Sequence, residues 1–257
     1  MKLRLPSAKE LASRLLPRRA AVWTRRAVEH VLPPPDLDAH EHALCEAVRP
    51  FTMTSPERIV SLEKAVRYVV ENELPGSIVE CGVWRGGSMM VVARTLLALG
   101  VRRELWLYDT FEGMPPPSDA DVSWRGTSAA DFLGAPERER DFNVWCIADE
   151  ADVRANVAST GYSLEAVHFV RGKVEETIPA RMPERIALLR LDTDWYESTR
   201  HELEHLYPRL VPGGVLIIDD YGYWQGARKA VDEYLASLAR KPLLQRIDSA
   251  GRLAIKV

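Results

Sequence analysis

Three aspartates stand where two short apolar runs of the chain end. Asp192 follows residues 187–191, and the pair Asp219 and Asp220 follows residues 215–218. Carboxylates that lie close together repel one another, so a group of three requires either protonation or a cation among them. Oxygen ligands with room left for water suit Mg²⁺. The alternative is that these acids cap helices or lie solvated in loops.

A β-α-β unit would bring the three acids together. Apolar runs of this length, bounded by glycine or charge, are typical of strands buried on both faces of a parallel sheet. Between the runs, side chains at helical spacing predict a helix: Tyr196, Thr199, Leu203, Leu206, Tyr207 and Leu210. A right-handed crossover puts both strand ends at one edge of the sheet, where open α/β sheets bind ligands. We therefore expect the three aspartates to converge there.

A glycine turn indicates a second binding feature. Residues 77–81 have the pattern of a strand, and Gly82, Gly86 and Gly87 precede a predicted helix over residues 89–99. Glycine lets the backbone approach a ligand closely, and the start of a helix offers free N–H groups. The spacing differs from the G-x-G-x-x-G of dinucleotide-binding folds, which disfavours a nicotinamide oxidoreductase.

The next predicted strand, residues 104–108, ends at an acid, Asp109. Nucleoside-binding α/β folds place a carboxylate about 20 residues after their glycine turn, where it grips the ribose hydroxyls. Asp109 lies at about this separation from Gly87. The other interpretation is an acid that caps the segment after the strand. Together with the glycine turn, Asp109 favours a nucleoside site.

The composition is typical of a soluble globular protein, and the net charge gives no reason to expect a nucleic-acid partner. The chain has 257 residues, of which 46% are hydrophobic and 28% charged, and its net charge is −3. This length is sufficient for one large domain with a well-formed core. No apolar run approaches the roughly 18 residues that a transmembrane helix needs. Three widely spaced cysteines, Cys45, Cys81 and Cys146, indicate a reduced protein, which we expect to be cytoplasmic.

The chain divides into an N-terminal arm and a main domain. Residues 1–50 are predicted to form a basic helical arm, either exposed or lying on a membrane or partner, and a proline-rich linker. Residues 51–257 form the main domain, whose first helix is predicted to begin at Ser55 as N-cap. The stretch of about 111–157 lacks periodicity and leaves the edge that carries the acids, so we interpret it as a lid. Residues 243–257 have the pattern of a closing hairpin.

Six motifs in register resemble one enzyme family. In chain order they are FTMT (51–54), VECGVWRGGS (79–88), YDTFEGMP (108–115), GKVEETIP (172–179), LDTDWYEST (191–199) and DDYGYWQGARKAVDEY (219–234). Together they look like the macrocin O-methyltransferase family of TylF type, whose members methylate sugar hydroxyls on natural products and glycans. The resemblance covers residues 50–257.

The resemblance implies a fold, a methyl donor and a metal. The fold would be the α/β, Rossmann-like class I methyltransferase, with a seven-stranded, mostly parallel sheet, an antiparallel last strand and helices on both faces. The donor would be S-adenosylmethionine and the metal Mg²⁺. By position, the residues implied around the donor are Met53, Glu80, Gly82, Val83, Ser88, Asp109, Gly172 and Lys173.

The resemblance also implies individual roles. Glu80 would lie near the methionine part of the donor, Asp109 would hold the ribose diol, and Lys173 would lie beside the adenine. Met53 would close over the donor. Asp192 matches the family's proposed general base. The metal ligands implied are Asp192, Asp219 and Asp220.

Methyl transfer to a hydroxyl suits these residues on chemical grounds too. The reaction is an in-line displacement at a sulfonium methyl group, and a sugar hydroxyl is a poor nucleophile at pH 7. A divalent ion lowers the pKa of such a hydroxyl, so we assign most of the activation to the ion and less to Asp192. His201 and His205 share a helix face and are rival bases, although we expect them to face solvent or a partner. The aromatic residues that follow the acids form either a sugar-stacking wall or core or dimer contacts: Trp195, Tyr196, Tyr221, Tyr223 and Trp224.

The acceptor is the part that the sequence leaves open. We expect a sugar in a natural-product glycoside, a glycolipid or a polysaccharide, for example a macrolide deoxysugar, rhamnose or a methylated mannoside. One alternative is a catechol or phenol acceptor that uses the same metal geometry. Another is a binding module without turnover, which the intact acids disfavour. We expect a homodimer.

Overall fold

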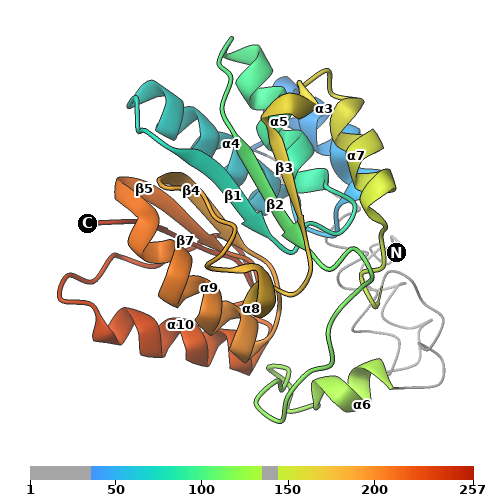
Figure 1. The fold of residues 1–257 in the computed structure, drawn as a ribbon, viewed down its shortest axis with the longest axis vertical. Helices are drawn as coiled ribbons and strands as arrows, with labels where there is room; N and C mark the ends of the chain where they lie inside the picture. Colours follow the sequence, from blue (N-terminus) through green and yellow to red (C-terminus); the bar gives the residue numbers. More distant parts are fainter. Residues whose placement is uncertain (1–35, 135–143) are drawn as a thin grey trace, which may run out of the picture.

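The computed structural model describes residues 36–134 and 144–257, which form a seven-stranded sheet with helices on both faces (Figure 1). The strands are β1 (Ser77–Cys81), β2 (Leu105–Asp109), β3 (Val167–Arg171), β4 (Ile186–Leu191), β5 (Leu210–Ile218), β6 (Gln245–Arg246) and β7 (Arg252–Ile255). Their order is β3-β2-β1-β4-β5-β7-β6. Strands β1 to β5 pair in parallel, and β7 is antiparallel to both of its neighbours. The predicted sheet is therefore confirmed.

Helices form a layer on each face of the sheet (Figure 1). One layer contains α3 (Ala39–Val48), α4 (Pro56–Glu71), α5 (Gly87–Ala98) and α7 (Glu150–Ala158), and the other contains α8 (Val174–Thr177), α9 (Tyr196–Leu206) and α10 (Gln225–Ser237). The short helix α6 (Ala129–Leu133) stands apart from both layers. Turns of 3₁₀ helix occupy Arg49–Phe51, Leu164–Ala166 and Tyr207–Arg209.

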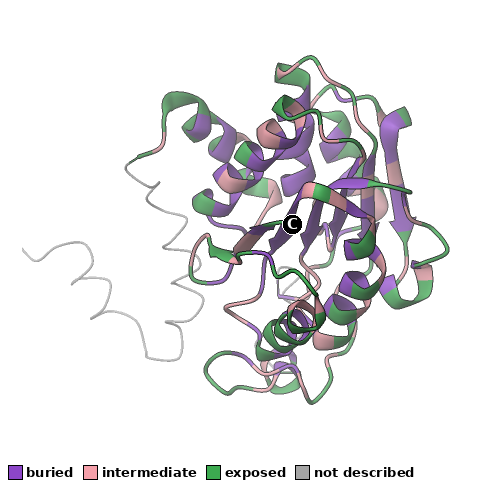
Figure 2. Cartoon of the chain, turned by 90° about the vertical axis from the view of Figure 1, so that its left-hand side faces the viewer, coloured by how far each residue is buried: buried purple, intermediate pink, exposed green. Residues whose placement is uncertain are grey.

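The central strands are buried on both faces, as Figure 2 shows in purple. In β1, Ile78 packs in the core beneath α4 and α5, whereas Val79 packs in the core beneath α9 and α10. Leu188 and Leu189 of β4 alternate in the same way. Since both faces need apolar side chains, these strands appear in the sequence as apolar runs, each interrupted by one charged residue, Glu80 in β1 and Arg190 in β4.

The crevice between β1 and β4 is the point at which the strand order reverses. From β1 the chain builds the sheet outward through β2 and β3, and it then returns to place β4 and β5 on the other side. The Asp192 N–H donates to the Cys81 carbonyl at 2.9 Å, and the Asp219 N–H donates to the Leu191 carbonyl at 2.9 Å. The predicted acids therefore lie at neighbouring strand ends, where open α/β sheets bind ligands.

Local predictions at the two ends of the main domain are confirmed. Ser55 caps α4, because its hydroxyl accepts a hydrogen bond from the Arg58 N–H at 3.3 Å, and Pro56 is the first helical residue. At the other end β6 and β7 form the hairpin, with Gln245 opposite Leu253.

Two boundaries differ from the sequence prediction. Leu44 and Val48 of α3 are buried in the core with α4 and α5, so the core begins before residue 51. Helix α7 occupies the last part of the stretch interpreted as irregular, and its Val153 and Val157 are buried in the same core. Since α7 is short, it contains too few apolar positions to show a helical period.

Part of the predicted organisation lies outside the described residues. The basic arm falls mostly on residues 1–35, and residues 135–143 belong to the predicted lid. The division into an arm and a domain stays a prediction. In the described ranges, no helix has both the length and the apolar character that crossing a membrane requires.

Replacement of Gly82 by alanine tests how closely β1 and β4 approach. Gly82 and Gly100 both have a positive φ, +79° and +67°, so alanine at either position costs about 1–2 kcal/mol of backbone strain. A Cβ at Gly82 would also lie 2.1 Å from the Asp192 carbonyl oxygen, whereas one at Gly100 meets nothing within 4 Å. We expect Gly82→Ala to lower the free energy of unfolding in urea by about 2 kcal/mol more than Gly100→Ala. Equal losses would contradict this close approach.

Candidate active site

One cavity opens at the carboxyl ends of β1, β2 and β4. All residues that the sequence predicts around a donor line it: Met53, Glu80, Gly82, Val83, Ser88, Asp109, Gly172 and Lys173. Asp192 and Asp219 line the same cavity. The tertiary structure thus brings the glycine turn and the acid cluster, which are far apart in the sequence, to one place.

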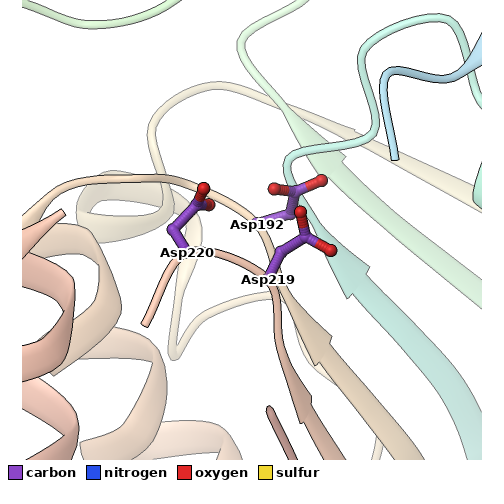
Figure 3. A group of neighbouring side chains, drawn as sticks. All are labelled: Asp192, Asp219 and Asp220. Atoms are coloured by element: carbon purple, nitrogen blue, oxygen red, sulfur yellow. The ribbon is translucent and has the colours of Figure 1, made fainter. Parts of the chain in front are cut away.

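The three predicted metal ligands form a compact group (Figure 3). Asp192, Asp219 and Asp220 each offer one carboxylate oxygen, and these oxygens lie within 4.8 Å of one another. Asp219 and Asp220 are buried, whereas the Asp192 side chain is 25% exposed. Three hard oxygen ligands on one side, with a cavity beside them, fit a Mg²⁺ ion that keeps some of its water.

Two buried arginines contact the acid group. In β4, Arg190 lies 2.6 Å from Asp219 Oδ1 through Nη2 and 2.9 Å from Asp192 Oδ2 through Nη1. From α4, Arg58 pairs with Asp219 Oδ2 through Nη1 and with Asp248 at 2.9 Å through Nε. A carboxylate oxygen has two lone pairs, so Asp219 still has capacity for a metal ion.

The electrostatic environment shifts the affinity of these groups for protons. Burial raises the pKa of Asp192 well above its ordinary value; the Arg190 charge opposes this, and Asp219 and Asp220 raise the pKa further. Burial by itself would lower the pKa of Arg58, but the charges of nearby carboxylates, above all Asp219, raise it beyond its usual range. Both arginines are therefore charged at any physiological pH.

Glu80 connects the acid group with the glycine turn. Its side chain is 1% exposed, and Oε1 accepts a hydrogen bond from Arg190. Its Oε2 accepts no hydrogen bond from the described residues. Burial raises the pKa of Glu80 to about 7, although the Arg190 charge opposes this shift. A buried carboxylate oxygen of this kind suits a cationic donor group in the cavity.

Asp109 has the capping role that the sequence left open, and it also holds the glycine turn. Its Oδ2 accepts hydrogen bonds from the N–H groups of Val83 at 2.8 Å and Trp84 at 3.0 Å, and its Oδ1 accepts one from Phe111 at 2.8 Å. The predicted ribose ligand thus also holds the backbone of the glycine turn. Trp84 has a positive φ of 45°, so this turn needs such support.

The predicted aromatic wall divides into two parts. Trp195, Tyr223 and Trp224 line the cavity, and the rings of the two tryptophans meet edge to face at 5.0 Å. Tyr196 and Tyr221 do not line it. Their hydroxyls instead donate to carboxylates of α10, Tyr196 to Glu233 and Tyr221 to Asp232. The cavity therefore has an apolar, aromatic side next to the predicted metal ligands.

The described first part of the predicted lid is docked on this wall. The indole N–H of Trp195 donates to the Pro115 carbonyl at 2.9 Å, and the backbone N–H of Gln225 donates to the Val122 carbonyl at 2.8 Å. The buried Asp121 accepts a hydrogen bond from the Tyr196 N–H at 2.8 Å and so caps α9. The lid segment and the starts of α9 and α10 form one unit.

The rival histidine bases lie away from the cavity. The His201 Nε2 donates to the Ile178 carbonyl at 3.0 Å, and its ring packs on that of His205 at 4.4 Å. Neither histidine lines the cavity. They are not placed to take a proton from a molecule bound there.

Comparison with known proteins identifies the family. The family model described as macrocin-O-methyltransferase (TylF) matches residues 21–254. The chain belongs to this family. The fold and the cavity described above are thus those of a TylF-type enzyme, and the resemblance found in the six motifs is confirmed.

Individual relatives agree with this assignment. The 8-demethyl-8-(2,3-dimethoxy-alpha-L-rhamnosyl)-tetracenomycin-C 4'-O-methyltransferase of Streptomyces olivaceus is 37% identical over 78% of this chain and 73% of its own length. The mycinamicin III 3''-O-methyltransferase of Micromonospora griseorubida is 36% identical over 71% of this chain and 69% of its own length. The solved structure of the O-methyltransferase NovP is 34% identical, with a TM-score of 0.69 over 80% of this chain and 82% of that one. The TylF-family chain is therefore an O-methyltransferase, with the class I fold.

The two arginines are the site residues that the sequence analysis missed, although both leave a signal. Arg190 is the one charged residue in the apolar run of β4, and a charge buried in a sheet requires carboxylate partners. Arg58 lies four residues before Leu62, on the buried face of α4. A charge at a buried helical position indicates an internal ion pair in the same way.

Asp121→Ala should loosen the docked lid segment. Because α9 loses its cap, we expect the free energy of unfolding in urea to fall by about 1–2 kcal/mol, and the KM for the acceptor to rise several-fold. Asp149→Ala is the matched control, since Asp149 caps α7 by accepting a hydrogen bond from the Asp152 N–H at 2.7 Å and does not line the cavity. The control should lose comparable stability and keep its KM. If the KM of Asp121→Ala is unchanged, the docked lid segment does not contribute to acceptor binding.

Proposed function

We propose that this enzyme transfers the methyl group of S-adenosylmethionine to a hydroxyl of a sugar in a glycoside, with Mg²⁺ as metal cofactor. The observation that carries this proposal is the acid group at the ends of β4 and β5, because two of its members, Asp192 and Asp219, line the same cavity as the glycine turn after β1. The names of the relatives that act on a rhamnosyl-tetracenomycin and on mycinamicin III support a glycosidic acceptor.

The donor occupies the β1–β2 side of the cavity. The free oxygen of Glu80 accepts a hydrogen bond from the ammonium group of the donor. Asp109 accepts a hydrogen bond from the ribose diol through Oδ1, in place of the long 3.4 Å hydrogen bond that this oxygen accepts from the Thr110 hydroxyl. The backbone at Gly82 and Val83 and the Ser88 side chain surround the methionine part. Residues 172–173 lie beside the adenine, and Met53 closes over the donor.

We assign the activation of the acceptor hydroxyl to the acid group. Asp192, Asp219 and Asp220 hold the Mg²⁺ ion, which supplies Lewis-acid activation of a hydroxyl group when bound. The hydroxyl oxygen forms a bond to the methyl carbon while the carbon–sulfur bond breaks, and the electron pair of that bond stays on sulfur, which becomes a neutral thioether. The hydroxyl proton goes to the Asp192 carboxylate, the member of the group that faces the cavity most openly.

The aromatic side of the cavity holds the sugar ring. Trp195, Tyr223 and Trp224 offer ring faces and edges beside the metal ligands, and the C–H groups of a sugar pack on such surfaces. Trp195 and Trp224 are each 4% exposed, and the docked lid fixes them. The acceptor is thereby oriented so that one hydroxyl points at the donor methyl.

A homodimer and a cytoplasmic location complete the proposal. The homodimer follows from the family resemblance alone. The cytoplasmic location is proposed because Cys45, Cys81 and Cys146 all have free thiols, which are typical of a reducing compartment. Analytical ultracentrifugation of the full chain tests the dimer.

Donor binding and metal dependence test the function directly. We expect calorimetric titration to show binding of S-adenosylmethionine, and methyl transfer to at least one glycoside of a panel to stop with EDTA and resume with Mg²⁺. Transfer that survives EDTA would contradict the three-aspartate metal site. Transfer to a simple catechol but to no glycoside would favour the phenol-type alternative.

Asp192→Asn tests the proton acceptor. The amide cannot take the proton and is a weaker metal ligand, so we expect kcat to fall by about 10²-fold or more while the dissociation constant of the donor stays nearly constant. The control is Asp232→Asn, which removes an exposed carboxylate on α10 and should leave both quantities unchanged. Equal losses of turnover and donor affinity in Asp192→Asn would instead indicate a structural role.

A further inference from the structure

Asp219 is held from both sides by a buried guanidinium group. Arg190 lies 2.6 Å from its Oδ1, and Arg58 pairs with its Oδ2. The side chains of Arg190 and Arg58 are 3% and 8% exposed, so neither charge is compensated by water. Arg190 also pairs with Glu80 and Asp192, and Arg58 also pairs with Asp248.

These two charges provide what a cluster of buried acids needs. Carboxylates that share a site repel one another, and a buried negative charge is costly unless a positive charge accompanies it. A bound divalent ion is one source of that positive charge. Here the described residues supply two positive charges, which contact Asp219 and, through Arg190, also Asp192.

The same charges oppose a divalent cation. Like charges repel, and the repulsion is stronger inside a protein than in water because the effective dielectric constant is lower. An arginine that contacts a metal ligand therefore lowers the affinity of the site for the ion. It also leaves the cluster stable when no ion is bound.

We propose that Arg58 and Arg190 are built-in counter-ions of the aspartate cluster, so that the fold does not depend on the metal and the ion exchanges freely with solution. This inference rests on the proposed metal site. As a consequence, the fraction of enzyme molecules that hold Mg²⁺ rises and falls with the free Mg²⁺ concentration, and the rate of methyl transfer changes with it. The cluster is thus a weak, preformed site and differs from a structural metal site, whose ion is needed for folding.

Arg58 is the better of the two residues for a test. Arg190 contacts Glu80 and Asp192, which have proposed roles in donor binding and proton transfer, whereas Arg58 contacts only Asp219 within the cluster. Arg58→Met alone would leave Asp248 buried without its partner. The double variant Arg58→Met/Asp248→Asn avoids this, because an asparagine can still accept the hydrogen bonds that Asp248 Oδ1 accepts from the Ala250 and Gly251 N–H groups.

Two variants should change metal affinity in opposite directions. In a calorimetric titration with Mn²⁺, without donor or acceptor, we expect Arg58→Met/Asp248→Asn to bind the ion about tenfold more tightly than the wild type, since a contacting positive charge is gone. Asp248→Asn alone should bind it more weakly, because Arg58 then loses its other carboxylate and its charge acts on Asp219 in full. Arg67→Met, on the same helix but paired with Glu63, should leave the affinity unchanged.

Thermal melting gives a second readout that does not need turnover. The wild type should melt within about 1 °C of the same temperature in EDTA and in Mg²⁺, because a weakly bound ligand adds little stability. The melting temperature of the double variant should rise by about 3 °C or more on addition of Mg²⁺.

The outcomes separate this inference from the proposed function. Suppose that methyl transfer is sensitive to EDTA. The inference is then overturned if EDTA lowers the melting temperature of the wild type by several degrees, or if the double variant binds Mn²⁺ more weakly than the wild type. Arg58 would in that case be a residue that orients Asp219. The absence of Mn²⁺ binding in every variant, together with transfer that survives EDTA, overturns the metal site itself.

Discussion

One buried guanidinium joins the two halves of the active site. Arg190 lies in β4, directly opposite Glu80 in β1, and its side chain also reaches Asp219 at the end of β5. A charge can stay inside the sheet only because carboxylates on both sides accept its hydrogen bonds. The register of β1, β4 and β5 is thereby tied to the geometry of the site, since a shift of one residue would turn these side chains to the opposite face.

Support for the site also comes from residues that do not line the cavity. Glu202 of α9 is fully buried, and its Oε1 accepts a hydrogen bond from the Thr193 hydroxyl, next to Asp192 in the chain, at 3.0 Å. Burial raises the pKa of Glu202 well above its ordinary value. On the other flank, Asp248 in the β6–β7 turn anchors Arg58. Such outer contacts orient the groups that face the ligand.

The proposed metal ligands and the aromatic wall belong to the same two loops. Asp192 and Trp195 lie on the loop between β4 and α9, and Asp220 and Trp224 lie on the loop between β5 and α10. The docked segment around Asp121 holds the starts of both helices. In the proposed function, one hydrogen-bonded unit would therefore position both the acceptor hydroxyl near the acids and the sugar ring against the tryptophans, as an in-line transfer requires.

The sequence by itself determined the sheet, its ligand-binding edge and the acids there. Apolar runs that end in Asp109, Asp192 or Asp219 specify buried strands and their ends, and the parallel connections bring those ends to one edge. Family motifs added the donor side of the cavity. Only the tertiary structure decided how charges are paired, because Arg58 and Asp219 are far apart in the sequence and no local pattern records their contact. It also decided that the predicted lid docks on the loops of β4 and β5, since hydrogen bonds between distant backbone segments depend on three-dimensional packing and leave no period in the chain.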